Sequence, residues 1–182
     1  MNSRHKHFIS RVELQLLESR SLEELTQAEF LSLLRSYNAV GAREEAFTTA
    51  LVATRKFPHD AHMLRWHRDA AHGWLAEPAS IATEFLRCIN ENVGPISFWR
   101  LALAEHYVGT AWAEDEEMLG SFPPCPEWLS LAAEVLESAQ VTASDFNQYW
   151  GRTTDNIQAT YEAVFDGLLR YEEFAQLRQL QS

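Results

Sequence analysis

The sequence predicts an all-α protein built from antiparallel pairs of helices. Apolar residues recur with the 3.6-residue period of an α-helix from one end of the chain to the other. Runs of alternating β-branched residues, which would predict strands, do not occur. Only 7 glycines and 6 prolines interrupt the 182 residues, and 46% of the residues are hydrophobic. This is enough apolar material for one core, so we expect a single helical domain over residues 1–182.

Capping residues predict where the first helices begin and end. A first helix is expected over residues 7–19, where Val12 and Leu16 share one stripe. Thr26 is a suitable N-cap, and Glu29 three residues later completes a capping box for a second helix that Gly41 ends. The next four helices are expected over 43–57, 60–75, from 78 to near 94, and 97–112. Pro58 ends the first of these four, Pro78 opens the third and Ser97 caps the fourth.

An acidic, proline-rich break at 113–126 separates these helices from the C-terminal part of the chain. Its second half, Gly-Ser-Phe-Pro-Pro-Cys-Pro at 120–126, is the strongest loop signal in the sequence. Beyond it, residues 127–182 carry four more helical patterns, at 127–138, 143–151, 155–167 and 171–180. The sequence therefore predicts about nine helices, several of them short enough to depend on packing against their neighbours.

One segment carries the pattern of a known helical repeat. Tyr37, Gly41, Ala46, Ala53 and Pro58 have the spacing of an aromatic residue between two helices, a turn glycine, two small contact residues and a terminating proline. With these positions, residues 27–60 resemble a tetratricopeptide repeat, the 34-residue helix–turn–helix unit of helical solenoids. A second unit is expected by spacing alone at 61–94. The resemblance implies a right-handed α-solenoid, because each such hairpin needs a neighbour to cover its apolar face.

The resemblance also implies a binding surface. In tetratricopeptide-like folds the first helix of each pair lines a concave groove that holds the partner. The corresponding positions are Leu31, Arg35, Asn38 and Ala39 in the first unit and, by spacing alone, Arg65, Asp69 and His72 in the second. This set lacks the Lys/Asn combination with which other members clamp a terminal carboxylate. A receptor for chaperone tails of that type is therefore not expected.

Charge narrows the kinds of partner. Lys and Arg number 15 and Asp and Glu number 26, which gives a formal net charge of −11. Nucleic acids and anionic membranes need a basic footprint, so neither is an expected partner. Residues 101–140 contain eight acidic residues and no Lys or Arg. This segment is either a solvated face or a patch that steers a basic protein partner. The candidate residues here are Trp112, Glu114, Asp115, Glu116, Glu117 and Trp128, since tryptophan is common in interface hot spots.

Four histidines form the main enzyme-like feature. His59, His62, His67 and His72 fall within fourteen residues. Helical metal sites need ligands three or four residues apart, whereas the last three histidines are five apart and cannot converge on one face. A metal-dependent hydrolase or metalloprotein centred on His59–His72 is therefore the alternative function, with polar helix faces as the simpler interpretation.

Other catalytic patterns are weak. Nucleophile-elbow, phosphate-binding and dinucleotide-binding glycine motifs are missing from the sequence. The acidic pairs at 23–24, 44–45 and 172–173 each begin a predicted helix, where carboxylates favour the helix dipole. Cys88 and Cys125 have no zinc or disulfide spacing and are interpreted as free thiols, and nothing local supports Cys125 with His106 as a nucleophile pair. No enzymatic activity, metal or cofactor is expected.

The sequence as a whole predicts a non-enzymatic protein–protein interaction module. Residues 1–11 lack the apolar segment of a signal peptide and no stretch is long enough to span a membrane, so we expect a cytoplasmic protein. An adaptor, a secretion chaperone and a neutraliser of a basic toxin are all compatible with this class. A self-associating structural module is a further alternative, because an incomplete solenoid leaves an apolar end that a homodimer would cover.

Overall fold

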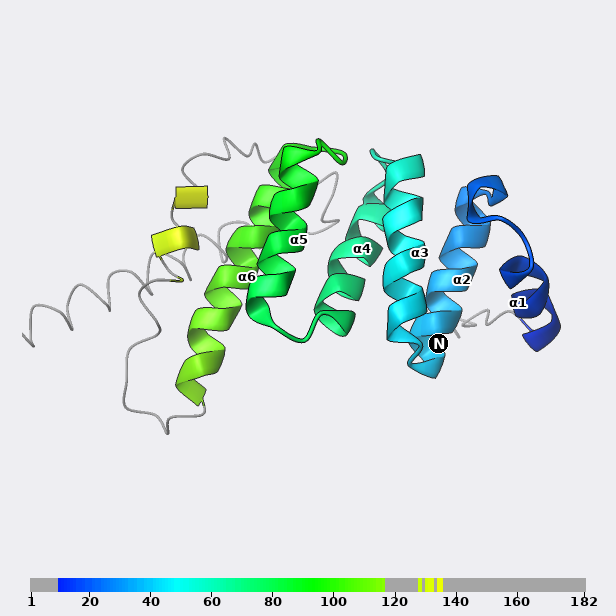
Figure 1. Ribbon diagram of the computed structural model, residues 1–182, viewed down its shortest axis with the longest axis horizontal. Coiled ribbons are helices and arrows are strands. Elements are labelled where there is room, and N and C mark those ends of the chain that lie inside the picture. The colour runs from blue at the N-terminus through cyan, green and yellow to red at the C-terminus, as the bar shows by residue number, and fades with distance from the viewer. Residues whose placement is uncertain (1–9, 117–127, 129, 133, 136–182) are drawn as a thin grey trace, which may run out of the picture. The chain divides into compact units, whose positions relative to one another are not determined.

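The computed structural model describes residues 10–116, 128, 130–132, 134 and 135, and for residues 108 and 111–116 it describes the backbone alone. All regular structure in these residues is helical, with neighbouring helices packed together, which confirms the predicted all-α class (Figure 1). Contacts divide the chain into two units, Met1–Ala76 and Glu77–Ser182. The boundary falls inside the predicted second repeat, 61–94, and the single domain stays a prediction.

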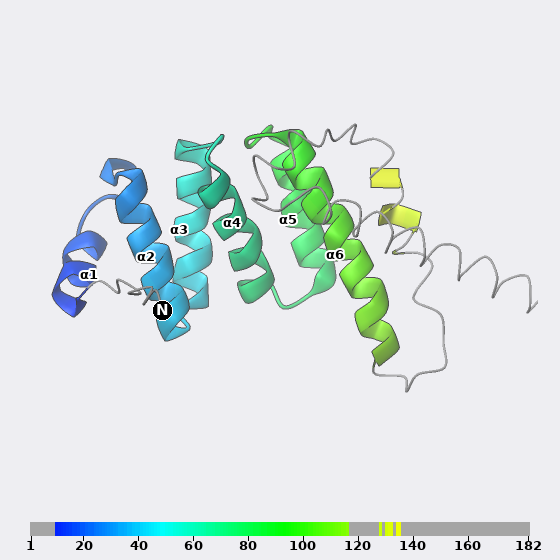
Figure 2. The same cartoon turned by 180° about the vertical axis from the view of Figure 1, so that it is seen from behind.

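The first unit contains four α-helices and one short 3-10 helix. They are α1 (Arg11–Glu18), η1 (Leu22–Glu24), α2 (Gln27–Val40), α3 (Arg43–Lys56) and α4 (Ala61–Trp74). Helix α3 packs against both α2 and α4, and α1 packs against α2; Figure 2 shows α2, α3 and α4 in succession from behind. Helix α1 begins at Arg11, not at residue 7 as predicted. The reason is Ser10, whose hydroxyl accepts from the Glu13 N–H and completes a capping box.

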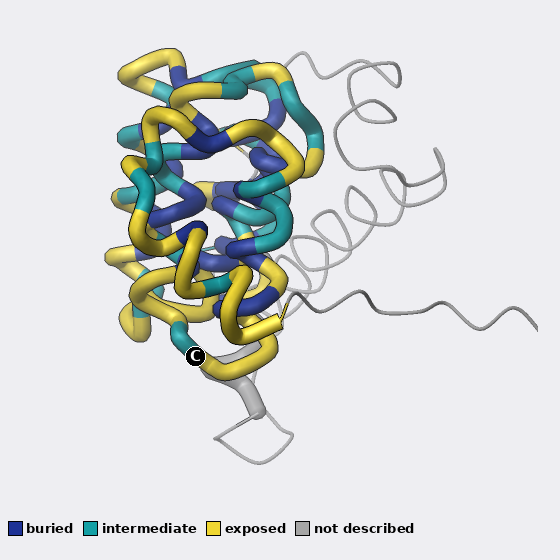
Figure 3. Tube along the Cα trace, turned by 90° about the vertical axis from the view of Figure 1, so that its right-hand side faces the viewer, coloured by how far each residue is buried: buried dark blue, intermediate teal, exposed yellow. Residues whose placement is uncertain are grey.

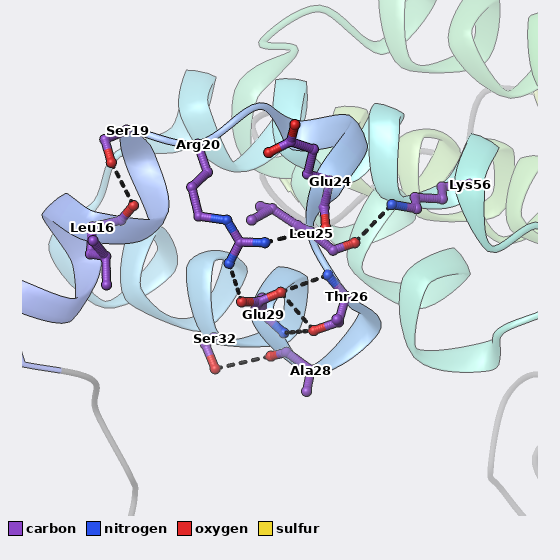
Figure 4. A network of polar contacts seen from close by, with 10 residues as sticks. All are labelled: Leu16, Ser19, Arg20, Glu24, Leu25, Thr26, Ala28, Glu29, Ser32 and Lys56. Carbon is purple, nitrogen blue, oxygen red and sulfur yellow. Dashed lines mark hydrogen bonds and ion pairs between the residues drawn. The ribbon is translucent and has the colours of Figure 1, made fainter.

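The predicted capping box of α2 is present and belongs to a larger polar network (Figure 4). The Thr26 N–H donates to Glu29 at 2.7 Å, and Arg20 forms an ion pair with the same carboxylate. The hydrogen bonds from Thr26, followed by the one from Arg20, lower the pKa of Glu29 to about 2. Lys56 of α3 donates to the Leu25 carbonyl at 2.9 Å. The segment before α2 is thus fastened to both α2 and α3.

The core of the first unit lies where α2, α3 and α4 face one another. Its buried apolar residues are Leu17, Leu25, Phe30, Leu33, Leu34, Tyr37, Ala46, Ala50, Ala53, Met63 and Ala70. Buried positions recur among exposed ones along α2, α3 and α4, as expected for helices with one apolar face, and Figure 3 shows buried and exposed segments interspersed along the backbone trace. The packed side of α3 consists of small residues, the alanines at 46, 50 and 53 with Thr49 and Thr54, which allows close approach of its neighbours.

Gly41 ends α2 as predicted, with φ +74 in the left-handed region. No neighbouring atom lies within 4 Å of the place that a Cβ would take at Gly41, so alanine would fit there without a clash. Its only cost would be the left-handed backbone conformation, which alanine disfavours. We expect Gly41→Ala to lower the free energy of unfolding by about 1 kcal/mol. Gly109→Ala is the matched control: that glycine is helical and equally open, so alanine should raise stability by about 0.5–1 kcal/mol. Urea unfolding measures the change in the free energy of unfolding for both variants. If the two changes had the same sign, the positive φ of Gly41 would not be what makes glycine favourable there.

The second unit contains α5 (Pro78–Asn90) and α6 (Ile96–Glu116), which pack against each other. Pro78 opens α5 as predicted, but the helix ends at Asn90, earlier than expected, because Asn92 and Gly94 both have positive φ. Ser97 is not the cap of α6. The helix already begins at Ile96, and the Pro95 carbonyl accepts from the Phe98 N–H at 3.1 Å. Helix α6 also continues past residue 112, the predicted end.

Two side-chain hydrogen bonds join the ends of α5 to α6. The buried Trp99 indole donates to the Val93 carbonyl just before α6, and His106 Nε2 lies 2.8 Å from the Pro78 carbonyl oxygen. Residues 128, 130–132, 134 and 135 are helical, within the predicted helix at 127–138. The predicted helices at 143–151, 155–167 and 171–180 lie outside the described residues. No described helix combines the length and apolar character that crossing a membrane requires.

Candidate functional site

A groove of about 350 Å³ lies in the first unit, where the C-terminal half of α4 faces the turn between α2 and α3. Its lining consists of Asn38, Gly41, Arg43, Ala46, Trp66, Asp69, Ala70, His72 and Gly73. Three of these, Asn38, Asp69 and His72, are among the groove residues predicted from sequence. Asn38 and His72 occupy equivalent positions of the two expected 34-residue units, and here both border one groove.

Local sequence explains why these side chains meet. Trp66, Asp69, Ala70 and Gly73 follow helical spacing, so they occupy one face of α4. Asp60 caps α4 by accepting from the N–H groups of residues 62 and 63, each at 2.9 Å. The second oxygen of the Asp60 carboxylate accepts from Gln27 at the start of α2. Two of the helices that line the groove, α2 and α4, are therefore tied together at their N-terminal ends.

The groove has an apolar floor and a polar rim. Ala46 and Ala70 are buried and Trp66 is half-buried, whereas Asn38, Arg43 and His72 are exposed. Asp69 is also exposed and forms an ion pair with Arg68, with 2.7 Å between Nη2 and Oδ1. The rim therefore offers an amide that donates and accepts, a guanidinium that donates and a carboxylate that accepts. Such a mixture suits the alternating N–H and C=O groups of a peptide backbone better than a single large charge.

The other predicted groove residues do not line this groove. Arg35 is exposed on α2, one turn before Asn38. Arg65 is half-buried: its Nε donates to the Ala61 carbonyl at 3.0 Å and its Nη2 lies 3.2 Å from His62 Nδ1. Leu31 is half-buried and Ala39 is exposed.

The predicted acidic patch falls mostly outside the described residues. Helix α6 includes positions 112 and 114–116, but the side chains of Trp112, Glu114, Asp115 and Glu116 lie outside the described part, as does all of Glu117. Trp128 is half-buried, and its ring centroid lies 5.4 Å from that of buried Tyr107. Part of the Trp128 surface thus contributes to packing within the second unit. The acidic patch itself stays a prediction.

The histidines occupy different environments. His59 and His62 are exposed, His72 is exposed at the groove, and His67 is buried with its ring centroid 5.9 Å from that of Phe47. His106 is buried beside Phe85, and this burial lowers its pKa, against the opposing effect of the Pro78 carbonyl. Cys125, which has no local sequence support as a nucleophile with His106, lies outside the described residues.

Of the acidic pairs, residues 44–45 lie in the first turn of α3 as predicted, whereas residues 23–24 lie in the short helix η1, before the Thr26 cap of α2. Glu44 and Glu45 also border a second pocket of about 500 Å³ in the first unit, which was not predicted. Its lining comes from α1, η1, α2, α3 and the segment after α1, so no single motif could have indicated it. The only sequence signal for this pocket is the acidic pair at 44–45, which the helix dipole also explains.

Comparison with known protein families, with curated proteins and with solved structures finds no match to this chain.

Proposed function

We propose that this chain is a non-enzymatic protein-binding module that holds an extended peptide segment of a partner in the groove between α2, α3 and α4. The observation that carries the proposal is the convergence of Asn38, Asp69 and His72, which were selected as groove residues by their place in 34-residue units. Adaptors, chaperones and toxin-neutralising proteins all use modules of this class.

The helix arrangement supports a tetratricopeptide-like solenoid as the framework of this module. Helices α2 and α3 form a hairpin around Gly41, and α3 also packs against α4, the next helix in the chain. In a solenoid of this type α2 and α4 are the first helices of successive pairs, and both supply rim residues here. Asn38 on α2 and His72 on α4 are then equivalent positions on one concave surface.

The chemistry of the groove favours binding over catalysis. Its rim combines exposed groups of both charges with an amide, and its one carboxylate is paired with Arg68. A general base or a nucleophile needs a positioned partner within hydrogen-bonding reach of the reacting group. The rim instead offers complementary hydrogen-bonding groups around the half-buried Trp66, an arrangement that suits a peptide with one apolar side chain seated on the indole.

A peptide library tests the proposal. A random library displayed on phage is selected against the full chain, and enriched peptides are measured by fluorescence polarisation. We expect Asn38→Ala and His72→Ala each to weaken binding about tenfold, since each removes a rim hydrogen bond. Asn90→Ala, an exposed asparagine at the end of α5, is the matched control and should change nothing. Selection without any enrichment, or binding unaffected by both groove variants, would contradict the proposed function.

A further inference from the structure

The second pocket of the first unit shares no lining residue with the groove. It lies on the side of the α2–α3 pair that faces α1 and η1, and its volume is about 500 Å³. Its lining consists of Glu18, Arg20, Leu22, Leu33, Tyr37, Glu44, Glu45, Thr48 and Thr49. The apolar part comes from Leu22, Leu33 and the ring of Tyr37, and the charged part comes mainly from three glutamates.

The pocket carries an excess of negative charge. Glu18, Glu44 and Glu45 contribute three carboxylates against one guanidinium, that of Arg20. Arg20 is engaged elsewhere, because it forms an ion pair with Glu29 and donates to the Glu24 carbonyl at 3.3 Å. Burial, followed by the charge of Glu18 and its interaction with the hydroxyl, raises the pKa of Tyr37 to about 12, and Glu45 adds to this effect. A cation entering the pocket would therefore be stabilised from several sides.

Thr49 gives an independent indication of a ligand. Its side chain is only 4% exposed and lines the pocket. Elsewhere in the first unit, helical hydroxyls at Ser32 and Ser36 donate to the carbonyl four residues earlier, and Thr54 donates to the Met63 carbonyl. Among the described residues, Thr49 has no such partner for its hydroxyl. Because this hydroxyl lines the pocket and forms no hydrogen bond within the described residues, it is available to a polar group that enters the pocket.

We propose that this pocket receives the side chain of a lysine or arginine from a protein partner. The aliphatic stem lies on Leu22 and the edge of Tyr37, and the charged head meets the carboxylates of Glu18 and Glu45 and the hydroxyl of Thr49. A polyamine fits less well, because its charges are spaced along the chain and some would lie on the apolar floor. The inference rests on the proposed protein-binding function and names the chemistry that the partner must present.

The direct test is an NMR titration of the ¹⁵N-labelled full chain with capped pentapeptides. One peptide has a central lysine between alanines, and the matched probe has norleucine, which keeps the stem and lacks the charge. We expect saturable shifts of the Thr49 and Tyr37 amides with the lysine peptide, with a Kd of about 1 mM, as befits a single anchored side chain. The norleucine peptide should bind at least about tenfold more weakly.

Variants locate the interaction. The double variant Glu44→Gln/Glu45→Gln should weaken lysine-peptide binding about tenfold, while Glu23→Gln, an exposed glutamate outside the pocket, should leave it unchanged. Thr49→Val should weaken binding about fivefold without lowering stability, since it deletes a hydroxyl that has no protein partner. Thr54→Val, which loses a bond to the Met63 carbonyl, should destabilise the unit and serves as the contrast.

Each negative result has a defined meaning. Equal shifts with norleucine, tighter binding of spermidine than of the lysine peptide, or no effect of the Glu44/Glu45 double variant would overturn the basic side-chain site. None of these results concerns the groove, because binding of library-selected peptides to the groove is tested separately with Asn38→Ala. If library peptides bind through Asn38 while the lysine peptide produces no shifts, this inference alone fails. If no peptide of either kind binds, the proposed function fails with it.

Discussion

Replacing Phe30 with alanine should lower the free energy of unfolding of the first unit by about 3–5 kcal/mol. Phe30 is completely buried on α2, and its ring meets that of Phe57 edge-on with centroids 6.1 Å apart. Truncation removes the contacts of a whole phenyl ring and leaves a cavity that the tied ends of α2 and α3 resist closing. Hydrogen exchange of the amides in α2 and α3 measures this effect locally.

Leu16→Ala is the control for Phe30→Ala. Leu16 is an apolar side chain on α1 that is 64% exposed, so its truncation should change stability by no more than about 0.5 kcal/mol. A cost below about 1 kcal/mol for Phe30→Ala would show that α2 does not depend on this core. We also expect Phe30→Ala to abolish peptide binding at elevated temperature, because Asn38 is held in place by the same helix.

Local chemistry explains which boundaries the sequence could predict. The helix from Gln27 to Val40 begins and ends at Thr26 and Gly41, residues whose effect depends only on their neighbours in the chain. The same reasoning applies to Ser10 and Glu13, which form an identical capping box that was not predicted, although the sequence contains its signal. The prediction that Ser97 caps a helix is wrong for a different reason. Serine suits an N-cap, but Pro95 already fixes the backbone before α6, so Ser97 lies within the first turn of the helix.

The candidate sites were predictable only to the extent that chain spacing determines them. Asn38 and His72 could be paired because a 34-residue offset relates equivalent positions on α2 and α4. Arg65 obeys the same offset, yet its guanidinium group turns back to the Ala61 carbonyl, a side-chain choice that spacing does not encode. The acidic pocket joins residues from Glu18 to Thr49 across several elements, so it depends on how those elements pack.

Trp99→Ala should lower the free energy of unfolding of the second unit by about 3–5 kcal/mol. Trp99 is completely buried in α6, packs against Phe85 and Phe98, and donates its indole N–H to the Val93 carbonyl. Trp99→Phe separates these contributions, because it retains an aromatic ring but leaves the carbonyl without its donor, and should cost about 1–3 kcal/mol. Hydrogen exchange of the α5 and α6 amides provides the measurement.

Trp74→Phe is the matched control for Trp99, since Trp74 is 43% exposed and its replacement should cost no more than about 0.5 kcal/mol. Peptide binding separates the two units further. Every residue that lines the groove lies between Asn38 and Gly73, within the first unit. Trp99→Ala should therefore leave the affinity of library-selected peptides unchanged at temperatures where the second unit stays folded. A large loss of affinity under those conditions would show that the binding site extends beyond the groove, and would place part of it in residues 77–182.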